Sequence, residues 1–543
     1  MNKLPVLLLF LGMLQYGFSQ DQKFTRQDTL KGSITPERAW WDLLYYDLDV
    51  TIDPEKRFIK GINTVTYKVI KPAKTLQIDL QNPMRLVLAT QNGQNLKIRS
   101  EGSAHFISLQ AKQATGTIHK LKLTFKGKPK VANNPPWDGG WTWQQDANGK
   151  PFAANANQGI GASVWWPNKD HPYDEVDSLD VHATVPKGVM AVSNGKLIDS
   201  SNAGNKMHTY HWAVKNPINN YGVNVNIADY AHFAGTFNGE KGPLSLDYYV
   251  RKENLEKAKK QFKQVPEMLR AFEHWLGPYP FYEDGYKLVE VPYLGMEHQS
   301  SVTYGNNYEN GYLGRDLSGS GWGDKFDYII IHESAHEWFA NNITNKDVAD
   351  MWIQEGFTTY AESLFVDYYY GKQAASEYVI GIRRLIRNDR PIIGVYGVDN
   401  EGSGDMYFKG SNILHTLRQL VDDDDKWRGI LRGISSTFYH QTVTSAQIEK
   451  YISDQSGFDL APFFEQYLRT VKIPKLEYKI KENALLFRYT DIIEGFKMPV
   501  KIKLNGKLKW IRPTAHWQSL NTDKNINEVN IDPNFYIDTI EIK

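Results

Sequence analysis

The hydrophobic pattern changes its period twice along the chain, and this change limits the fold more than any other feature. From about Tyr45 to Gly239, apolar residues alternate with polar ones, which is typical of β-strands. From about Glu253 to Leu468 they recur at helical spacing, and after Pro474 the alternation returns. A chain of 543 residues is also too long for one compact domain. The pattern predicts an α+β multidomain protein.

We place the domain boundaries where the period changes. The prediction is an antiparallel β domain at residues 20–243, a mainly helical domain at 244–472 and a small C-terminal β domain at 473–543. Within the helical part, the apolar spacing predicts helices over residues 255–276, 326–340, 353–370 and 374–388.

The first 19 residues have the features of a signal peptide. Lys3 supplies a positive start, Leu4 to Leu14 an apolar stretch, and Gly17-Phe18-Ser19 a small-x-small cleavage site. The apolar stretch is short for a membrane span. An uncleaved anchor or a buried helix is the alternative. We therefore expect an exported protein, periplasmic or secreted and from a bacterium, without a stable membrane span after cleavage.

The absence of cysteine narrows the chemistry. The chain contains no Cys, so disulfides, Cys-ligated metals and thiol nucleophiles are excluded. A bound metal must be held by histidines and carboxylates. The formal net charge is +1, and phosphate binding requires a positive surface, so nucleic acid is not expected as a partner.

A metal-binding motif with helical spacing lies beyond the middle of the chain. The segment IIIHESAHEWFANN contains His332, Glu333 and His336. Positions i and i+4 share a helix face, so both imidazoles can ligate one ion. Glu333 is rotated by about 100° and can reach a water beside that ion. The alternative is a solvated helix face with two exposed histidines.

Two further acidic residues follow in MWIQEGFTTYAESLF. Glu355 comes after 18 intervening residues and completes the two-His, one-Glu ligand set of a catalytic zinc, with a fourth position open for water. We therefore predict one Zn²⁺ per chain. Glu362, two helical turns further, either hydrogen-bonds a ligating imidazole or is an ordinary exposed residue.

A loop rich in Trp and Gly, PPWDGGWTW, spans Pro135 to Trp143. Such a loop suits a carbohydrate-stacking platform, but packing or lining of a cleft is the interpretation we favour.

The zinc segments and three others resemble one known family. HESAHEWFANN followed by WIQEGFTTYAE is similar to the gluzincin zinc aminopeptidases, the group of aminopeptidase N and leukotriene hydrolase. LGMEHQS resembles the family's G-x-M-E-N signature, MYFKGSNILHTL its Tyr-x-Lys-Gly segment, and NQGIGASVWWPNKDHP a segment of its first domain. The resemblance runs from about Tyr45 to Leu468.

The resemblance implies a thermolysin-like catalytic domain and a role for each matched residue. Glu333 is implied as the general base and Tyr407 as the catalytic tyrosine that stabilises the oxyanion. The implied zinc ligands are the three residues already named, His332, His336 and Glu355. The implied substrate-binding residues, of which Glu297 and Gln158 would hold the free α-amine, are Gly295, Met296, Glu297, His298 and Gln158.

The sequence departs from the family pattern at two places. Many relatives carry a large helical C-terminal domain, whereas 73 residues follow Thr470 here and alternate like strands. His298 stands where the family has Asn, which gives different hydrogen-bonding reach and a titratable ring.

The sequence-based conclusion is a zinc-dependent aminopeptidase that hydrolyses peptides with a free N-terminus. The alternatives are a thermolysin-like endopeptidase or an epoxide hydrolase on the same site, an inactive binding protein of the same fold, and a glycan-binding module.

Overall fold

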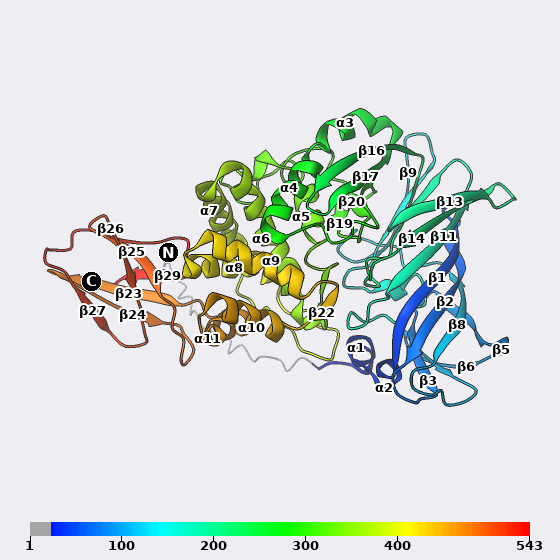
Figure 1. The fold of residues 1–543 in the computed structure, drawn as a ribbon, viewed down its shortest axis with the longest axis horizontal. Helices are drawn as coiled ribbons and strands as arrows, with labels where there is room; N and C mark the ends of the chain where they lie inside the picture. The colour runs from blue at the N-terminus through cyan, green and yellow to red at the C-terminus, as the bar shows by residue number, and fades with distance from the viewer. Residues whose placement is uncertain (1–22) are drawn as a thin grey trace, which may run out of the picture.

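The computed structural model describes residues 23–543, so the predicted signal peptide at residues 1–19 lies outside the described residues. Three parts follow one another along the molecule: a β-rich part, a helical part and a smaller β part (Figure 1). The predicted multidomain α+β fold is confirmed. Within residues 23–543, none of the helices combines the length and the apolar character needed to cross a bilayer.

The N-terminal part is built on an eight-stranded sheet. Tyr46, Leu48, Val50 and Ile52 alternate along β1 and are fully buried, as the period of two predicts. The sheet is antiparallel except for the parallel pair of β1 and β11. Its strand order is β13 (Lys196–Asn202), β14 (Met207–Val214), β11 (Ser178–Pro186), β1 (Trp41–Asp53), β2 (Phe58–Val69), β8 (Ile118–Gly127), β4 (Arg85–Gln91) and β5 (Gln94–Asn95).

Two smaller sheets and two short helices complete this part. The helices precede the first strand and are α1 (Arg26–Gly32) and α2 (Pro36–Ala39). One sheet has the order β12 (Met190–Ser193), β15 (Val225–Ala228), β10 (Pro151–Ala156) and β9 (Gly140–Gln145). The other has the order β3 (Thr75–Asp79), β7 (Ala104–Ser108) and β6 (Lys97–Glu101).

A five-stranded sheet connects the β-rich part to the helices. The predicted boundary at residue 243 falls inside its first hairpin, which pairs β16 with β17. The strand order is β16 (Tyr230–Gly239), β17 (Gly242–Arg251), β18 (Tyr286–Glu290), β20 (Val302–Tyr304) and β19 (Gly295–Met296).

The helices of the middle part differ from the predicted ranges at three places. The predicted helix over 255–276 is two helices, because Pro266 has no N–H to continue the hydrogen-bond ladder. The helix predicted for 326–340 ends at Ala335, and the one predicted for 374–388 ends at Gly381. The observed helices are α3 (Leu255–Gln261), α4 (Gln264–Leu276), α5 (Tyr328–Ala335), α6 (Trp352–Tyr370), α7 (Lys372–Gly381), α8 (Phe408–Val421), α9 (Asp424–Thr437), α10 (Ser445–Ser456) and α11 (Ala461–Arg469).

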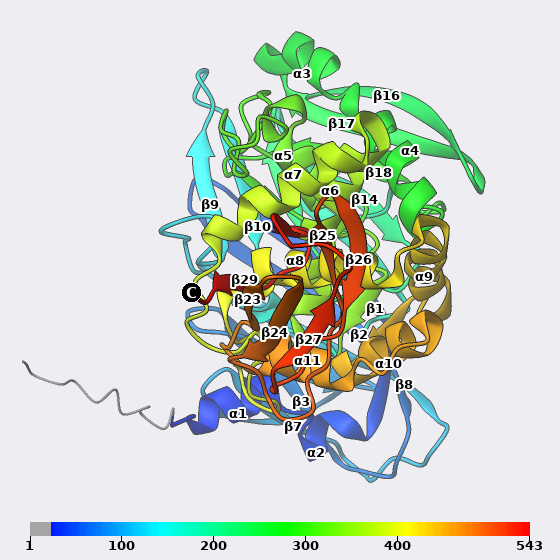
Figure 2. The same cartoon turned by 90° about the vertical axis from the view of Figure 1, so that its left-hand side faces the viewer.

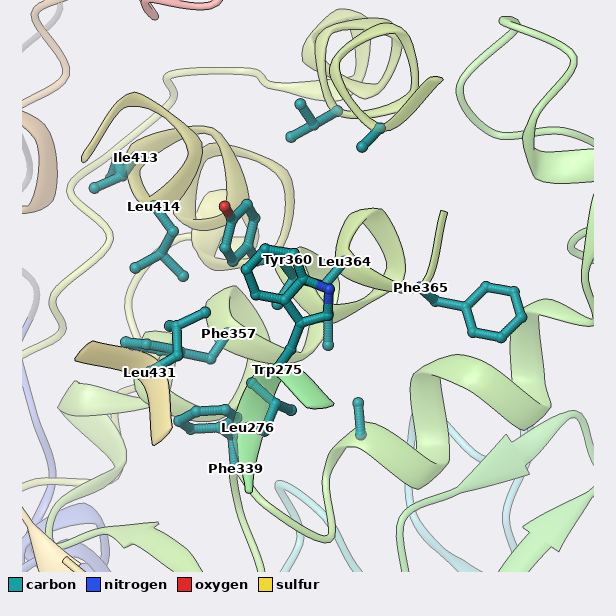
Figure 3. Close-up of a cluster of buried hydrophobic side chains, with 14 of the residues drawn as sticks. Trp275, Leu276, Phe339, Phe357, Tyr360, Leu364, Phe365, Ile413, Leu414 and Leu431 are labelled. Atoms are coloured by element: carbon teal, nitrogen blue, oxygen red, sulfur yellow. The ribbon is translucent and has the colours of Figure 1, made fainter. Parts of the chain in front are cut away.

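Helix α6 runs through the core of the middle part. All of its residues from Trp352 to Val366 are buried. Apolar side chains from α4, α8 and α9 surround it, as Figure 3 shows for Trp275, Leu414 and Leu431. A helix that is buried on all sides is a rigid support, so residues on α6 are held in fixed positions.

The C-terminal part contains two sheets that pack beside the helices (Figure 2). Its buried residues, such as Leu476, Val500 and Phe535, belong to the same hydrophobic core as the helices. The first sheet has the order β27 (Gln518–Asn521), β24 (Ala484–Thr490), β23 (Lys475–Lys481) and β29 (Asp538–Glu541). The second has the order β26 (Lys507–Ile511), β25 (Val500–Leu504) and β28 (Val529–Ile531). A short two-stranded sheet in the helical part pairs β21 (Ile343–Asn345) with β22 (Gln441–Val443).

Candidate active site

Helix α5 carries the first two candidate ligands and is fixed at both ends. At its start, the Asp327 carboxylate caps the helix by accepting from the backbone N–H groups of Ile329 and Ile330. Beyond Ala335 the chain continues as a turn, and Ala340 has a φ of 136°, outside the right-handed helical region, so the helix could not extend to residue 340 as predicted. His336 still has right-handed helical backbone angles, so it stays on the same face as His332.

Helix α6 brings the third candidate ligand to the two histidines. The Oε2 atom of Glu355 lies 3.3 Å from Nε2 of His336 and 3.8 Å from Nε2 of His332. All three side chains are buried, and their ligand atoms lie within 4.8 Å of one another. Within residues 23–543, Oε2 of Glu355 has no hydrogen-bond partner. Two imidazole nitrogens and a buried, unpartnered carboxylate oxygen fit one Zn²⁺.

Each candidate ligand histidine is oriented through its other ring nitrogen. Nδ1 of His332 lies 2.6 Å from Oε1 of Glu362, whose Oε2 accepts a 2.6 Å hydrogen bond from the Tyr378 hydroxyl. Nδ1 of His336 lies 2.9 Å from the carbonyl oxygen of Phe339 and 3.1 Å from the Thr358 hydroxyl. These contacts leave both Nε2 atoms free to face Glu355.

A second group of polar side chains lies beside the candidate ligands. Nε2 of Gln158 donates to Oε1 of Glu297 and to Oε1 of Glu355, each at 2.8 Å. The Tyr221 hydroxyl donates to the same oxygen of Glu297 at 3.1 Å. Glu297 is buried, and burial raises the pKa of its carboxyl. Gln158 thus connects a candidate substrate-binding acid to a candidate metal ligand.

The site opens into a cavity of about 450 Å³. Its lining includes the candidate residues Gly295, Met296 and Tyr407 together with the three candidate metal ligands and Glu333. Strand β19 packs so closely on α5 that a Cβ at Gly295 would lie 2.6 Å from Cγ2 of Ile329. Only glycine therefore allows this strand to run along the helix that carries the metal motif.

Glu333 and Tyr407 line this cavity from two different elements. Glu333 lies on α5, and burial raises the pKa of its carboxyl to about 7. Tyr407 precedes α8 and is half-buried, with its ring stacked on His332 at a centroid distance of 6.2 Å. Burial also raises the pKa of the Tyr407 hydroxyl, and the charge of Glu355 adds to this, so the hydroxyl keeps its proton.

His298 lies apart from the other candidates. Its side chain is fully buried, it is not among the residues that line the cavity, and neither ring nitrogen has a hydrogen-bond partner within residues 23–543. Burial lowers the pKa of the imidazole to about 3. The ring is therefore neutral at ordinary pH, and a direct contact between His298 and substrate stays a prediction.

Three residues of the site were not predicted from the sequence. Thr358 lies three positions after Glu355 on α6, so helical spacing could have indicated it. Tyr221 and Tyr378 have no such signal, because they reach the site from separate segments. Trp137, in the Trp-rich loop, lines the cavity, as the cleft-lining interpretation of that loop expected.

Comparison with protein families gives two matches. The family description "Peptidase M1 N-terminal domain" matches residues 43–221, and "Peptidase family M1 domain" matches residues 260–467. Together they account for well over half of the chain and include every candidate ligand. The chain belongs to peptidase family M1.

The relatives of this M1 chain described below have low sequence identity to it. A Xenopus laevis leukotriene A-4 hydrolase is 25% identical over 288 residues, which is 50% of this chain and 44% of the relative. A Mus musculus aminopeptidase B is 24% identical over 476 residues, 78% of this chain and 68% of the relative. The chain thus spans less than half of the leukotriene hydrolase and about two thirds of aminopeptidase B.

Solved structures support the M1 fold. A mutant M1 zinc metallopeptidase from Deinococcus radiodurans, bound to a Tyr-Ser-Ala substrate, superposes with a TM-score of 0.68. Its sequence is 22% identical, and the match covers 82% of this chain and 98% of that chain. The M1 architecture therefore extends over most of the described residues. Zinc is the metal that fits both the M1 family and the donor set of His332, His336 and Glu355.

Proposed function

We propose that this chain is a zinc-dependent aminopeptidase that removes single residues from peptides with a free N-terminus. The observation that carries the proposal is the position of Gln158, which is 2.8 Å from both Glu297 and Glu355. An anion that can bind an ammonium group thus lies directly beside the metal-binding group. This arrangement fits a substrate whose α-amine is one residue away from the bond that is cut.

The chain's own residues supply the remaining chemistry. Bound zinc would supply a Lewis acid that polarises the scissile carbonyl and promotes ionisation of water. Glu333, in the cavity wall, takes a proton from the attacking water and passes it to the leaving amine. Tyr407 donates a hydrogen bond to the developing oxyanion. Glu297 and Gln158 hold the α-ammonium and so fix the register of the peptide.

The alternatives fit the same site less well. An endopeptidase or an epoxide hydrolase has no need for a buried acid that binds an amine beside the metal. An inactive binding protein has no chemical reason to keep both Glu333 and Tyr407 in the lining of one cavity. These comparisons favour the aminopeptidase, and the experiment below distinguishes it from each alternative.

The test uses one peptide with a free N-terminus and its N-acetylated twin, with products identified by mass spectrometry. Acetylation removes the ammonium charge, so the chain should release single residues from the free peptide alone. Glu297→Ala should keep zinc and lose the preference for the free peptide. Equal internal cleavage of both peptides would favour the endopeptidase. Turnover of neither peptide by the zinc-loaded protein would contradict the proposal.

We also propose that the protein is exported. The support is the sequence pattern of residues 1–19 alone. N-terminal sequencing of the protein purified from its native cells checks this, because cleavage after Ser19 would leave Gln20 as the first residue. An N-terminus at Met1 would contradict it.

A further inference from the structure

Helix α1 lies before the region that matches the M1 family, yet its Lys31 contacts Gly159, the residue that follows Gln158 of the active site. It begins with a capping box in which the side chains and backbone N–H groups of Thr25 and Asp28 hydrogen-bond each other. Its Leu30 packs into a small apolar cluster with Ala104 and Phe106 of the β-rich part. Figure 1 shows α1 at the lower edge of the molecule, where the β-rich part meets the helical part.

The end of α1 is held by a buried arginine. Nη1 of Arg38 donates to the carbonyl oxygens of Lys31, at 3.1 Å, and Ser33, at 2.8 Å. Nη2 of Arg38 pairs with Asp79 at 2.7 Å, and the guanidinium is fully buried. His171 adds a contact of 3.2 Å from its Nε2 to the carbonyl oxygen of Gly32. The backbone that carries Lys31 therefore has a fixed position.

From this position the Lys31 side chain joins two loops that belong to different parts of the molecule. Its ammonium group donates to the carbonyl oxygen of Gly159 at 2.8 Å and to Oδ2 of Asp399 at 2.6 Å. Gly159 follows Gln158, the residue that contacts both Glu297 and Glu355. Asp399 belongs to the loop between α7 and α8 in the helical part.

The backbone of α1 also contacts the second loop. The N–H of Asp399 donates to the carbonyl oxygen of Asp28 at 3.1 Å. A Cβ at Gly32 would lie 2.0 Å from the carbonyl carbon of Val398, so the two backbones touch and glycine is required there. Helix α1 and the loop around Asp399 are thus one packed unit.

The two loops joined by Lys31 form walls of a cavity next to the catalytic one. This cavity has a volume of about 440 Å³ and is lined by Gln158, Gly159 and the loop residues 399–402. It shares Trp137 and Gln158 with the catalytic cavity. A displacement of either loop therefore changes the shape of this adjoining cavity, and a displacement of Gln158 changes the catalytic cavity as well.

We propose that Lys31 is a positioning residue that fixes Gln158 and the loop of residues 399–402 relative to each other. This proposal rests on the proposed function, in which Gln158 binds the α-amine of the substrate. Lys31 does not touch the substrate itself. It acts through its hydrogen bonds to Gly159 and Asp399. The Lys31 ammonium thus links Gly159 of the β-rich part to Asp399 of the helical part, and we call this link the brace.

The test compares Lys31→Met, Lys31→Arg and Arg26→Met. Lys31→Met keeps the length of the side chain and removes the ammonium. Lys31→Arg keeps a cation that can donate to both a carboxylate and a carbonyl. Arg26→Met is the matched control, since Arg26 is on the same helix and pairs with Glu101 of β6 at 3.0 Å, away from the cavities.

The kinetic readout separates positioning from a general loss of stability. Lys31→Met should raise KM for aminoacyl fluorogenic substrates by about tenfold with a smaller change in kcat, because the amine-binding side chain is misplaced. Lys31→Arg should restore most of the loss, and Arg26→Met should have the KM of the wild type. An unchanged KM in Lys31→Met, or the same rise in Arg26→Met, would overturn the proposal.

A second readout does not depend on activity. Amide hydrogen exchange at Asp399 and in residues 394–402 should be faster in Lys31→Met than in Arg26→Met, at equal thermal midpoints. Unchanged exchange there would overturn the brace even in a protein without peptidase activity. If exchange is faster in Lys31→Met but the wild-type protein cleaves no peptide, the role of Lys31 as a brace stands and the proposed function is contradicted.

Discussion

At the scale of single residues, the chemistry of the site depends on which atoms remain free. Both imidazoles use Nδ1 to contact groups of the protein, and both Nε2 atoms face Oε2 of Glu355. Glu333, next to His332 in sequence, forms a second group with Glu297 and His336, whose ligand atoms also lie within 4.8 Å of one another, so His336 belongs to both groups. Glu355 has an oxygen near the Nε2 atoms of both histidines, which favours Glu355 as the metal ligand and Glu333 as the base.

We predict that Glu333→Gln keeps zinc and loses turnover. Glu333 is not among the three proposed ligands, and the amide has the size of the carboxylate but cannot accept a proton at neutral pH. The expected loss in kcat is roughly 10²- to 10⁴-fold, as for a missing general base. Zinc content is measured by atomic absorption beside the rate, with His336→Gln as the variant that should lose the metal. A variant that loses zinc and keeps its rate would contradict these roles.

Tyr407→Phe should leave binding intact and slow the reaction. It removes one hydroxyl from the cavity wall and keeps the ring stacked on His332. By analogy with other donors to an oxyanion, the loss is about 10²- to 10³-fold in kcat, with little change in KM. Steady-state kinetics on one aminoacyl substrate measures both. A near-native kcat would mean that Tyr407 is a packing residue.

At the scale of elements, the metal motif depends on how α5 is anchored. Asp327 accepts hydrogen bonds from the first turn of α5 and also from Tyr304 of β20, at 2.7 Å, and from Asn306 and Gln261. One carboxylate thus joins the helix, the five-stranded sheet and α3. Its removal leaves several buried donors without an acceptor.

Asp327→Ala should therefore destabilise the protein more than the loss of a helix cap alone. We expect about 2–4 kcal/mol from the lost cap together with the unpaired buried donors. Asp423→Ala is the control, because Asp423 caps α9 by accepting from Lys426 N–H but is exposed, so its loss should cost about 1 kcal/mol. Urea unfolding at fixed zinc concentration measures both. Equal losses would show that the buried partners of Asp327 add nothing.

The elements that the sequence predicts well are those with a repeated signal. The alternation along β1 repeats over several residues, so periodicity can reveal it, and the spacing of His332 and His336 is a recognisable motif of one helix face. Strands β19 and β20 are two and three residues long and carry no period, although they form the wall beside α5. The sheet that holds them also contains parallel pairs between distant segments, which alternation cannot indicate.

The candidate site shows the same limit at longer range. The contacts of Gln158 and Tyr221 with Glu297 span 139 and 76 positions of the chain. Gln158 was found through the family resemblance alone, and Tyr221 was not found. The shape of the β-rich part, which no local pattern encodes, brings these two residues to the metal-binding group.

At the scale of the whole molecule, the C-terminal β part is joined to the helices by three polar contacts as well as by the shared core. Nε2 of His415 on α8 lies 2.8 Å from Oδ1 of Asn534. The N–H of Tyr536 donates to the Thr416 hydroxyl at 3.0 Å, and the Tyr467 hydroxyl of α11 donates to the carbonyl oxygen of Tyr536 at 2.6 Å. Residues 534–536 therefore dock on two helices.

His415 makes this junction sensitive to pH. Burial lowers the pKa of its imidazole to about 3, whereas a histidine in the unfolded chain has a pKa near 6.5. Between these values the unfolded state binds a proton that the folded state does not. The stability that His415 contributes is therefore fully present above about pH 6.5 and is lost as the pH falls.

We predict that His415→Gln removes this dependence while keeping the hydrogen bond. The amide of Gln can donate to Oδ1 of Asn534 but does not titrate. From pH 7 to pH 5, the free energy of unfolding of the wild type should fall by about 2 kcal/mol more than that of the variant. Urea unfolding of both proteins at several pH values, at one zinc concentration, gives the difference, in which the contributions of all other groups cancel. Parallel pH profiles, whatever the constant offset between them, would contradict the prediction, because they would mean that His415 binds a proton as readily in the folded protein as in the unfolded one.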